Sequence, residues 1–212
     1  MQSKMPDDRI PTMPARWSWV LASALVAVSG VASAEPERFE IDPEHLSVGF
    51  LVSHIDYARV LGMFQEGEGS FTFDEETGEL SDLRMAISTD SVFTDHEKRD
   101  EHLRSPDFLN AAEFPEMVYT AAGASSSSDR EYQIDGELEL LGSKRPVPLQ
   151  ATWNKSGRYP FGGGLLGQPP YAMGVSIRGS FKRSEFGMTY GVDNGLVGDE
   201  VELIIEFEAQ RQ

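Results

Sequence analysis

The feature that most constrains this chain is an alternation of apolar and polar side chains that recurs along most of its length, with exceptions such as Ile204. In the segment 201–208, alternate positions carry Val201, Leu203, Ile205 and Phe207, and three glutamates occupy positions between and after them. A period of two places successive side chains on opposite faces of a β-strand. Strands with one apolar and one polar face are typical of antiparallel sheets, so the pattern predicts an all-β fold.

The same alternation is present in the segments 48–52, 71–73, 83–87, 132–140, 147–153 and 175–181. Turn-forming stretches separate them at 75–78, 125–129 and 192–195. About eight strands in one domain must close or divide, because a long open sheet leaves exposed edges. We therefore expect an antiparallel eight-stranded β-barrel with one or two short helices, and a two-sheet sandwich is the alternative.

The amino-terminal 34 residues have the three-part layout of a secretory signal peptide. A polar start with three basic residues precedes an apolar run from 17 to 31, which ends in Ala32-Ser33-Ala34. We expect cleavage near Ala34, a mature domain at 35–212, and a periplasmic or secreted location. An uncleaved anchor is the alternative, but serines and a glycine interrupt the run, which is marginal for spanning a bilayer.

The charge of the chain excludes several partners. Residues 35–212 keep 15 Lys and Arg against 33 Asp and Glu, a net charge of −18. Such a surface repels nucleic acid and anionic membranes, and no later segment is long and apolar enough for stable membrane insertion. The chain has no cysteine, so disulfides, thiolate nucleophiles and cysteine-based metal sites are all excluded.

Two segments depart from the alternation. Thr94, with Glu97 three residues later, predicts a capping box and a helix over 95–104, followed by a turn at 106–109. This helix is either a crossover packed on the barrel wall, the simpler interpretation, or a cover over one mouth. The loop 159–174 is rich in glycine, proline and apolar side chains. It could pack on the barrel, line an opening or meet a second copy, which leaves a homodimer open.

Three stretches resemble the YceI family of polyisoprenoid-binding, lipid-binding YceI-like domains. They are residues 41–74, which include Gly62 and Phe64, residues 90–121, which include RDEHLRSPDF and Glu113-Phe114-Pro115, and residues 177–209, which include KRSEFGM and VGDEV. The resemblance implies a lipocalin-like antiparallel barrel with an apolar tunnel for a long amphiphile. The expected ligand is an isoprenoid-type lipid, either a polyprenyl chain or an isoprenoid quinone, and no other cofactor is expected.

We predict that this lipid lies against side chains that share one face of the strands. The predicted ligand-binding residues are Phe50, Val52, His54, Phe71, Phe73, Leu83, Ile87, Ile134, Leu138, Val175, Ile177 and Phe181. Strand parity cannot separate a tunnel lining from a packed core. His54 either bonds a quinone carbonyl or phosphate, or is simply hydrogen-bonded in the barrel.

The remaining polar candidates have structural interpretations. Arg99, Asp100 and His102 are interpreted as a salt-bridged set that fixes the helix to the barrel, and Arg183 with Glu185 in the same way. No metal site is expected, because His96 and His102 are not on one helical face. No catalytic residues are assigned, since GxSxG is absent and no carboxylate pair stands out. A lipid-modifying enzyme and an envelope stress or scaffold protein without a specific ligand are the alternative functions.

Overall fold

The computed structural model describes residues 35–162 and 167–212. The predicted signal peptide and the Leu165-Leu166 part of the apolar loop lie outside these residues. The described chain is mostly strand, as the alternation predicts. The strands are β1 (Glu37–His54), β2 (Ala58–Phe64), β3 (Gly67–Phe73), β4 (Leu80–Ser88), β5 (Val92–Phe93), β6 (Glu116–Ala121), β7 (Ala124–Ser128), β8 (Glu131–Leu140), β9 (Ser143–Arg158), β10 (Tyr171–Lys182) and β11 (Val197–Arg211). The helices are η1 (Thr89–Ser91), α1 (Glu97–Arg104) and η2 (Arg183–Phe186).

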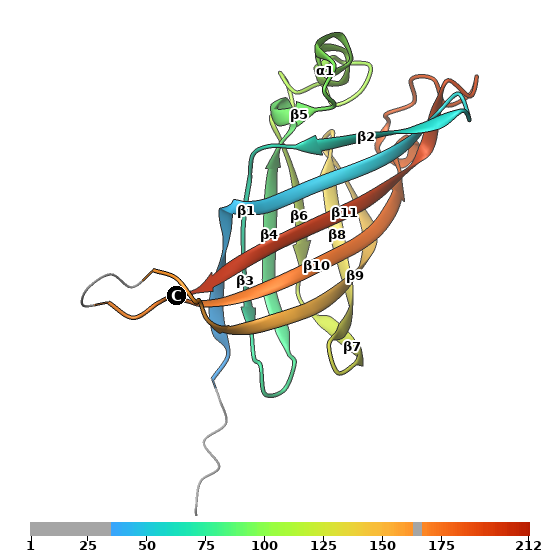
Figure 1. Cartoon of the computed structure of the whole chain (residues 1–212). Coiled ribbons are helices and arrows are strands. Elements are labelled where there is room, and N and C mark those ends of the chain that lie inside the picture. The colour runs from blue at the N-terminus through green and yellow to red at the C-terminus, as the bar shows by residue number, and fades with distance from the viewer. Residues whose placement is uncertain (1–34, 163–166) are drawn as a thin grey trace, which may run out of the picture. The chain divides into compact units, whose positions relative to one another are not determined.

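Eight of the strands close an antiparallel barrel. The order is β11-β10-β9-β8-β6-β4-β3-β1, and β1 pairs in turn with β11 from Phe39 opposite Arg211 to His54 opposite Val197. Figure 1 shows these strands wrapping around one interior, with α1 beyond one end. The predicted eight-stranded barrel is therefore confirmed, and the sandwich alternative is wrong because the hydrogen-bonded ladder returns to its first strand.

Strand β1 pairs with β11 along one edge and with two successive neighbours along the other. Its first residues, 37–40, pair with β3, and residues 48–54 pair with β2. The pairing with β11 shifts register between Ile41 and Leu46, which marks a bulge that re-aims the strand. The bend carries the end of β1, with Ser53 and His54, to the end of the barrel where α1 lies (Figure 1).

The apolar faces of the eight barrel strands point into the barrel interior. Phe39 and Phe71 stack with their ring centroids 5.4 Å apart, and Phe71 also contacts Phe207 from β11. Gly136 leaves space for the ring of Tyr119, whose hydroxyl donates to the carbonyl of Val147 at 2.9 Å. A Cβ at position 136 would lie 2.4 Å from that ring, so only glycine fits this crossing.

Two local predictions are wrong. Ser125–Ser128, expected as part of a turn, belong to β7, which pairs with β8. Its serines are mostly exposed, so an apolar pattern could not reveal this strand. The helix begins at Glu97 instead of 95, and its N-cap is His96, whose Nδ1 accepts from the amide of Arg99. Thr94 is instead buried, and its amide donates to the carboxylate of Asp100 within the helix.

Candidate ligand-binding site

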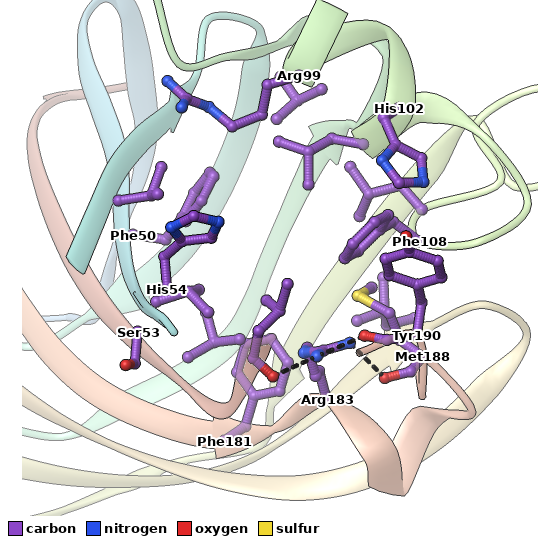
Figure 2. A pocket seen from close by; sticks show the side chains of 18 of the residues that line it. Phe50, Ser53, His54, Arg99, His102, Phe108, Phe181, Arg183, Met188 and Tyr190 are labelled. Carbon is purple, nitrogen blue, oxygen red and sulfur yellow. Dashed lines mark hydrogen bonds between the residues drawn. The ribbon is translucent and has the colours of Figure 1, made fainter. Parts of the chain in front are cut away.

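A cavity of about 350 Å³ lies at the α1 end of the barrel. Apolar side chains make up most of its lining, including Phe50 and Val52 from β1, Val60 from β2, and Phe181 and Leu203 from β10 and β11. Figure 2 shows this cavity surrounded by side chains from several elements. Strands supply its floor and walls, because their inward positions alternate with outward polar ones.

The α1 segment covers this end of the barrel and is held by buried polar contacts. Asp100 is buried and accepts from the amide of Thr94 at 2.8 Å and from its hydroxyl. Arg99 donates from Nε to the Thr94 hydroxyl and from Nη2 to the Thr94 carbonyl, both at 2.7 Å. Thr94 thus links the helix to the preceding β5. Arg99 and Asp100 each bond to Thr94 and not to each other. The interpretation of these two residues as salt-bridged is therefore wrong.

Arg183 is 1% exposed and forms the second anchor of this end. It donates to the backbone carbonyls of Met188, Tyr190, Val197 and Gly198 at 2.8–2.9 Å. Burial lowers the pKa of this guanidinium, partly offset by the more distant Asp199. The predicted pairing with Glu185 is wrong: Glu185 is exposed, and Arg183 makes no ion pair within the described residues.

Aromatic rings join α1 to the loop after η2. The ring of His102 lies 5.0 Å from Phe108 and 4.9 Å from Tyr190, both edge to face, and Phe108 lies 5.2 Å from Tyr190. His102 Nε2 also contacts a carboxylate oxygen of Asp107 at 2.9 Å. These contacts place the helix and its following turn over the cavity (Figure 2). The cover interpretation therefore describes this segment better than a crossover on the barrel wall.

The predicted ligand-binding residues all line interior space, and they are distributed over three cavities. Phe50, Val52, His54 and Phe181 line the large cavity. Leu83, Ile87, Leu138 and Ile177 line a second cavity of about 60 Å³, and Phe71, Phe73, Ile134 and Val175 line a third of about 50 Å³. Phe181 borders the first two and Ile177 the last two, so the cavities follow one another through the barrel. Contact of these side chains with a ligand remains a prediction.

His54 lies at the mouth of the large cavity, as its strand parity indicates. Its side chain is exposed and makes no hydrogen bond or ion pair within residues 35–162 and 167–212. The interpretation of His54 as a residue hydrogen-bonded in the barrel is therefore wrong. The neighbouring Ser53 donates its hydroxyl to Asp56 at 3.1 Å and leaves the imidazole free.

Sequence reasoning missed the part of the cavity lining that lies outside the strands. Leu103, Phe108 and Leu109 belong to α1 and its following turn, and Met188 and Tyr190 follow η2. These segments have no alternation, so parity could not assign an inward face to them. The only sequence signals were RDEHLRSPDF and KRSEFGM, which were interpreted as fixing the fold.

Metal-binding clusters and membrane-spanning helices are both missing from the described part of the chain. No group of three or more His, Asp or Glu side chains there is arranged to hold a metal ion. None of the helices in these residues is long and apolar enough to cross a bilayer.

The fold and cavity define a small antiparallel β-barrel of the kind that encloses a single ligand. The YceI-like domain model matches residues 39–209, and protein YceI of Salmonella newport is 36% identical over 196 residues, covering 92% of this chain and 96% of the relative. The chain therefore belongs to the YceI family.

Solved structures agree with this assignment. The YceI protein of Campylobacter jejuni superposes with a TM-score of 0.66 at 26% identity, covering 76% of this chain and 90% of that one. A polyisoprenoid binding domain from Saccharophagus degradans, implicated in plant cell wall breakdown, superposes with a TM-score of 0.59 at 11% identity, covering 84% and 100%. At that identity the second likeness shows the shared fold alone.

Proposed function

We propose that this protein is an exported binding protein that holds one isoprenoid-type lipid, a polyprenyl chain or an isoprenoid quinone, in the large cavity. The observation that carries the proposal is the cavity itself, about 350 Å³ of apolar-walled space at one end of a closed barrel. An empty apolar space of this size loses dispersion contacts on every wall. A flexible hydrocarbon chain restores those contacts without demanding directional bonds.

The energetics favour a carrier or sequestering role. Burying a methylene group from water gains about 0.8 kcal/mol, so a few prenyl units suffice for tight holding against water. A bilayer interior is equally apolar, so moving the same tail from membrane to barrel is close to neutral. Discrimination between one lipid and another then comes from the shape of the cavity and from polar contacts at the lipid head group.

Two further observations support the proposal. The polyisoprenoid binding domain of Saccharophagus degradans has the same fold, which makes a prenyl chain a reasonable cargo to test first. The predicted signal peptide supports an envelope or extracellular location. Ser53 and His54 are neighbours in the lining, but the Ser53 hydroxyl donates to Asp56 and not to the imidazole. Because a serine nucleophile needs such a base, we favour binding over catalysis.

The test uses two neighbouring positions on β2 that face opposite sides of the barrel wall. Val60 lines the cavity, whereas Leu61 is 64% exposed on the outer face. Val60→Trp should fill part of the cavity and remove co-purified lipid. Leu61→Trp adds the same ring outside and should leave the lipid in place. Native mass spectrometry, followed by solvent extraction and lipid analysis, measures both.

The proposal predicts an isoprenoid lipid in the wild-type protein and in Leu61→Trp, and its absence in folded Val60→Trp. Circular dichroism confirms that each variant keeps its strand content. If the wild-type protein, purified without detergent, neither carries a lipid nor takes up an added polyprenol, the cavity does not serve this purpose. A fatty acyl lipid in the wild-type protein would retain the binding role and overturn the isoprenoid assignment.

A further inference from the structure

Most of the exposed large apolar side chains in the described residues come from one end of the barrel. Eight such side chains are exposed, and seven of them belong to the β1–β2 turn, β2, β5 and the loop after η2. These four segments all lie at the α1 end (Figure 1). We call the seven side chains the apolar rim: Ile55, Tyr57, Leu61, Met63, Phe93, Tyr190 and Leu196. The eighth, Phe161, lies in the loop that precedes β10, at the opposite end of the barrel.

Strand register makes part of the rim a continuous surface on the outer wall of the barrel. Met63 on β2 is opposite Phe93 on β5 and opposite Gly49 on β1. Gly49 is in turn opposite Ile204 on β11. A Cβ at position 49 would lie 3.8 Å from the Cβ of Ile204, so the two residues share a face. Ile204, which interrupts the alternation of β11, therefore extends the apolar surface across a further strand.

The rim adjoins the large cavity. Tyr190 and Leu196 belong to both, because they are exposed and also line the cavity. The amide of Ile55 donates to the carbonyl of Leu196 at 3.2 Å, which joins the β1–β2 turn to the loop after η2. On β2, Val60 lines the cavity from inside while the next residue, Leu61, is exposed outside. A surface that contacts the rim therefore lies next to the contents of the cavity.

The β1–β2 turn carries apolar side chains that its own folding does not require. Ile55 and Asp56 have φ angles of 51° and 55°, and the amide of Tyr57 donates to the carbonyl of His54 at 3.2 Å. Glycine, asparagine and aspartate suit such positions, whereas a β-branched isoleucine is strained there. Ile55 is nevertheless 44% exposed and Tyr57 is 91% exposed. Contact with an apolar surface outside the molecule accounts for both side chains.

Charge favours a neutral surface as the partner of the rim. Residues 35–212 carry a net charge of −18, so two copies of the chain repel each other, and an anionic membrane repels each copy. Arg59, the basic residue of β2, is paired with Glu202 and adds little attraction. A zwitterionic bilayer has no net charge, and its interface accepts apolar side chains and the amphipathic ring of tyrosine.

We propose that the apolar rim docks this end of the barrel on the surface of a zwitterionic bilayer. The choice of a membrane rests on the proposed function, because the same end of the barrel holds the cavity for a membrane lipid. Docking removes the exposed apolar side chains from water and places the cavity against the source of its ligand. The contact is peripheral, since it uses side chains of turns and strands at one end of the barrel.

Flotation with phosphatidylcholine vesicles tests the docking. Protein purified without detergent is mixed with the vesicles, and the fraction that floats with them gives a partition coefficient. A double variant, Tyr57→Ser with Leu61→Ser, should lower this coefficient about ten-fold or more, because two apolar side chains no longer leave water. Phe161→Ser removes a ring that is 74% exposed at the opposite end and should change the coefficient little. All the proteins share one amino terminus, so a difference between them does not come from the leader.

The composition of the vesicles tests the charge argument. Replacing part of the phosphatidylcholine with phosphatidylglycerol should weaken binding at low salt, and raising the ionic strength should restore it. Tighter binding to the anionic vesicles would overturn the assignment of a zwitterionic surface. Circular dichroism checks that each variant keeps its strand content, which substitutions at exposed positions should preserve.

The outcomes separate the docking surface from the proposed function. Neither Tyr57 nor Leu61 lines the large cavity, so lipid that co-purifies with the protein reports on the proposed function independently. If the wild-type protein carries a lipid but does not float, or floats as well as the double variant, the docking is overturned and the proposed function stands. If it floats through the rim but neither carries nor takes up a lipid, the docking stands and the proposed function is wrong. A dimer in light scattering that the double variant dissociates would make the rim an interface between copies and overturn the membrane assignment.

Discussion

The guanidinium of Arg183 lies over the ring of Phe108, with its Cζ 5.7 Å from the ring centroid. This contact joins η2 to the turn after α1, two segments that are 75 residues apart and meet only at the covered end of the barrel. Together with its four carbonyl partners, this contact makes Arg183 an anchor of this end of the barrel.

Arg183→Met should destabilise the protein by about 3 kcal/mol or more, because it leaves several buried carbonyls without donors. Arg183→Lys should recover only part of this loss, since an ammonium cannot reproduce the planar fork of donors. Urea unfolding followed by circular dichroism measures both. Lys182→Met, at an exposed neighbouring position, is the control and should change the free energy of unfolding little. Equal effects at positions 182 and 183 would contradict the anchoring role of Arg183.

Ile177 tests how far a lipid tail reaches into the barrel. It is 3% exposed and borders the two small cavities, so Ile177→Trp should overpack the interior and cost about 1–3 kcal/mol. Ile177→Asp should unfold the domain, because it buries an unpaired carboxylate. Gln150→Asp, exposed on β9, is the matched control. A folded Ile177→Asp variant that has lost its lipid would instead indicate a continuous tunnel in which the lipid tail reaches Ile177.

The pair between His45 and Asp42 predicts a pH-dependent contribution to stability. His45 Nδ1 lies 3.0 Å from a carboxylate oxygen of Asp42 in the β1 bulge. Hydrogen bonding to Asp42 raises the pKa of His45 above its ordinary 6.5, and the same bond lowers the pKa of Asp42 below 3.8. The histidine contribution is fully present below pH 6.5 and is lost as pH rises through the raised pKa. The aspartate contribution is present above pH 3.8 and is lost as pH falls through the lowered pKa.

His45→Gln should therefore lower the melting temperature at pH 5 and have little effect at pH 9. The effect should be small and sensitive to salt, because the histidine is exposed. Scanning calorimetry of both proteins at the two pH values checks this. A melting-temperature difference that is the same at pH 5 and pH 9 would rule out a titrating pair.

The predicted leader gives a chemical test of export. The mature protein should begin at Glu35, because small residues at positions 32 and 34 suit a signal peptidase. Amino-terminal sequencing of protein from the cell envelope checks the site. Ala34→Leu should slow processing and leave a longer form attached to membranes. Wild-type protein that retains Met1 in the membrane pellet would contradict cleavage.

Strand parity predicted the barrel and the inward side chains well, and the reason is physical. Residues 131–140 and 201–208 alternate because one face of a closed sheet packs inside and the other meets water. The strand β7 has no apolar face to reveal it, and β5 has only two residues. Even Val175 and Val52, both correctly turned inward, line cavities of very different size. Parity fixes the direction of a side chain but not how completely its neighbours fill the space.

The α1 segment and the loop after η2 were harder to predict, because side chains there bond largely to backbone atoms. Arg183 bonds four carbonyls, and no sequence pattern indicates which carbonyls will converge on a guanidinium. Thr94 suits a helix cap by residue type, and only its burial against Asp100 shows that it does something else.

The closed ladder between β1 and β11 has a kinetic consequence. Because side chains of α1 and of the loop after η2 line the large cavity, a ligand of the proposed kind that enters through this end of the barrel must pass them. The residence time of a ligand is then governed by local opening of those segments, and not by global unfolding.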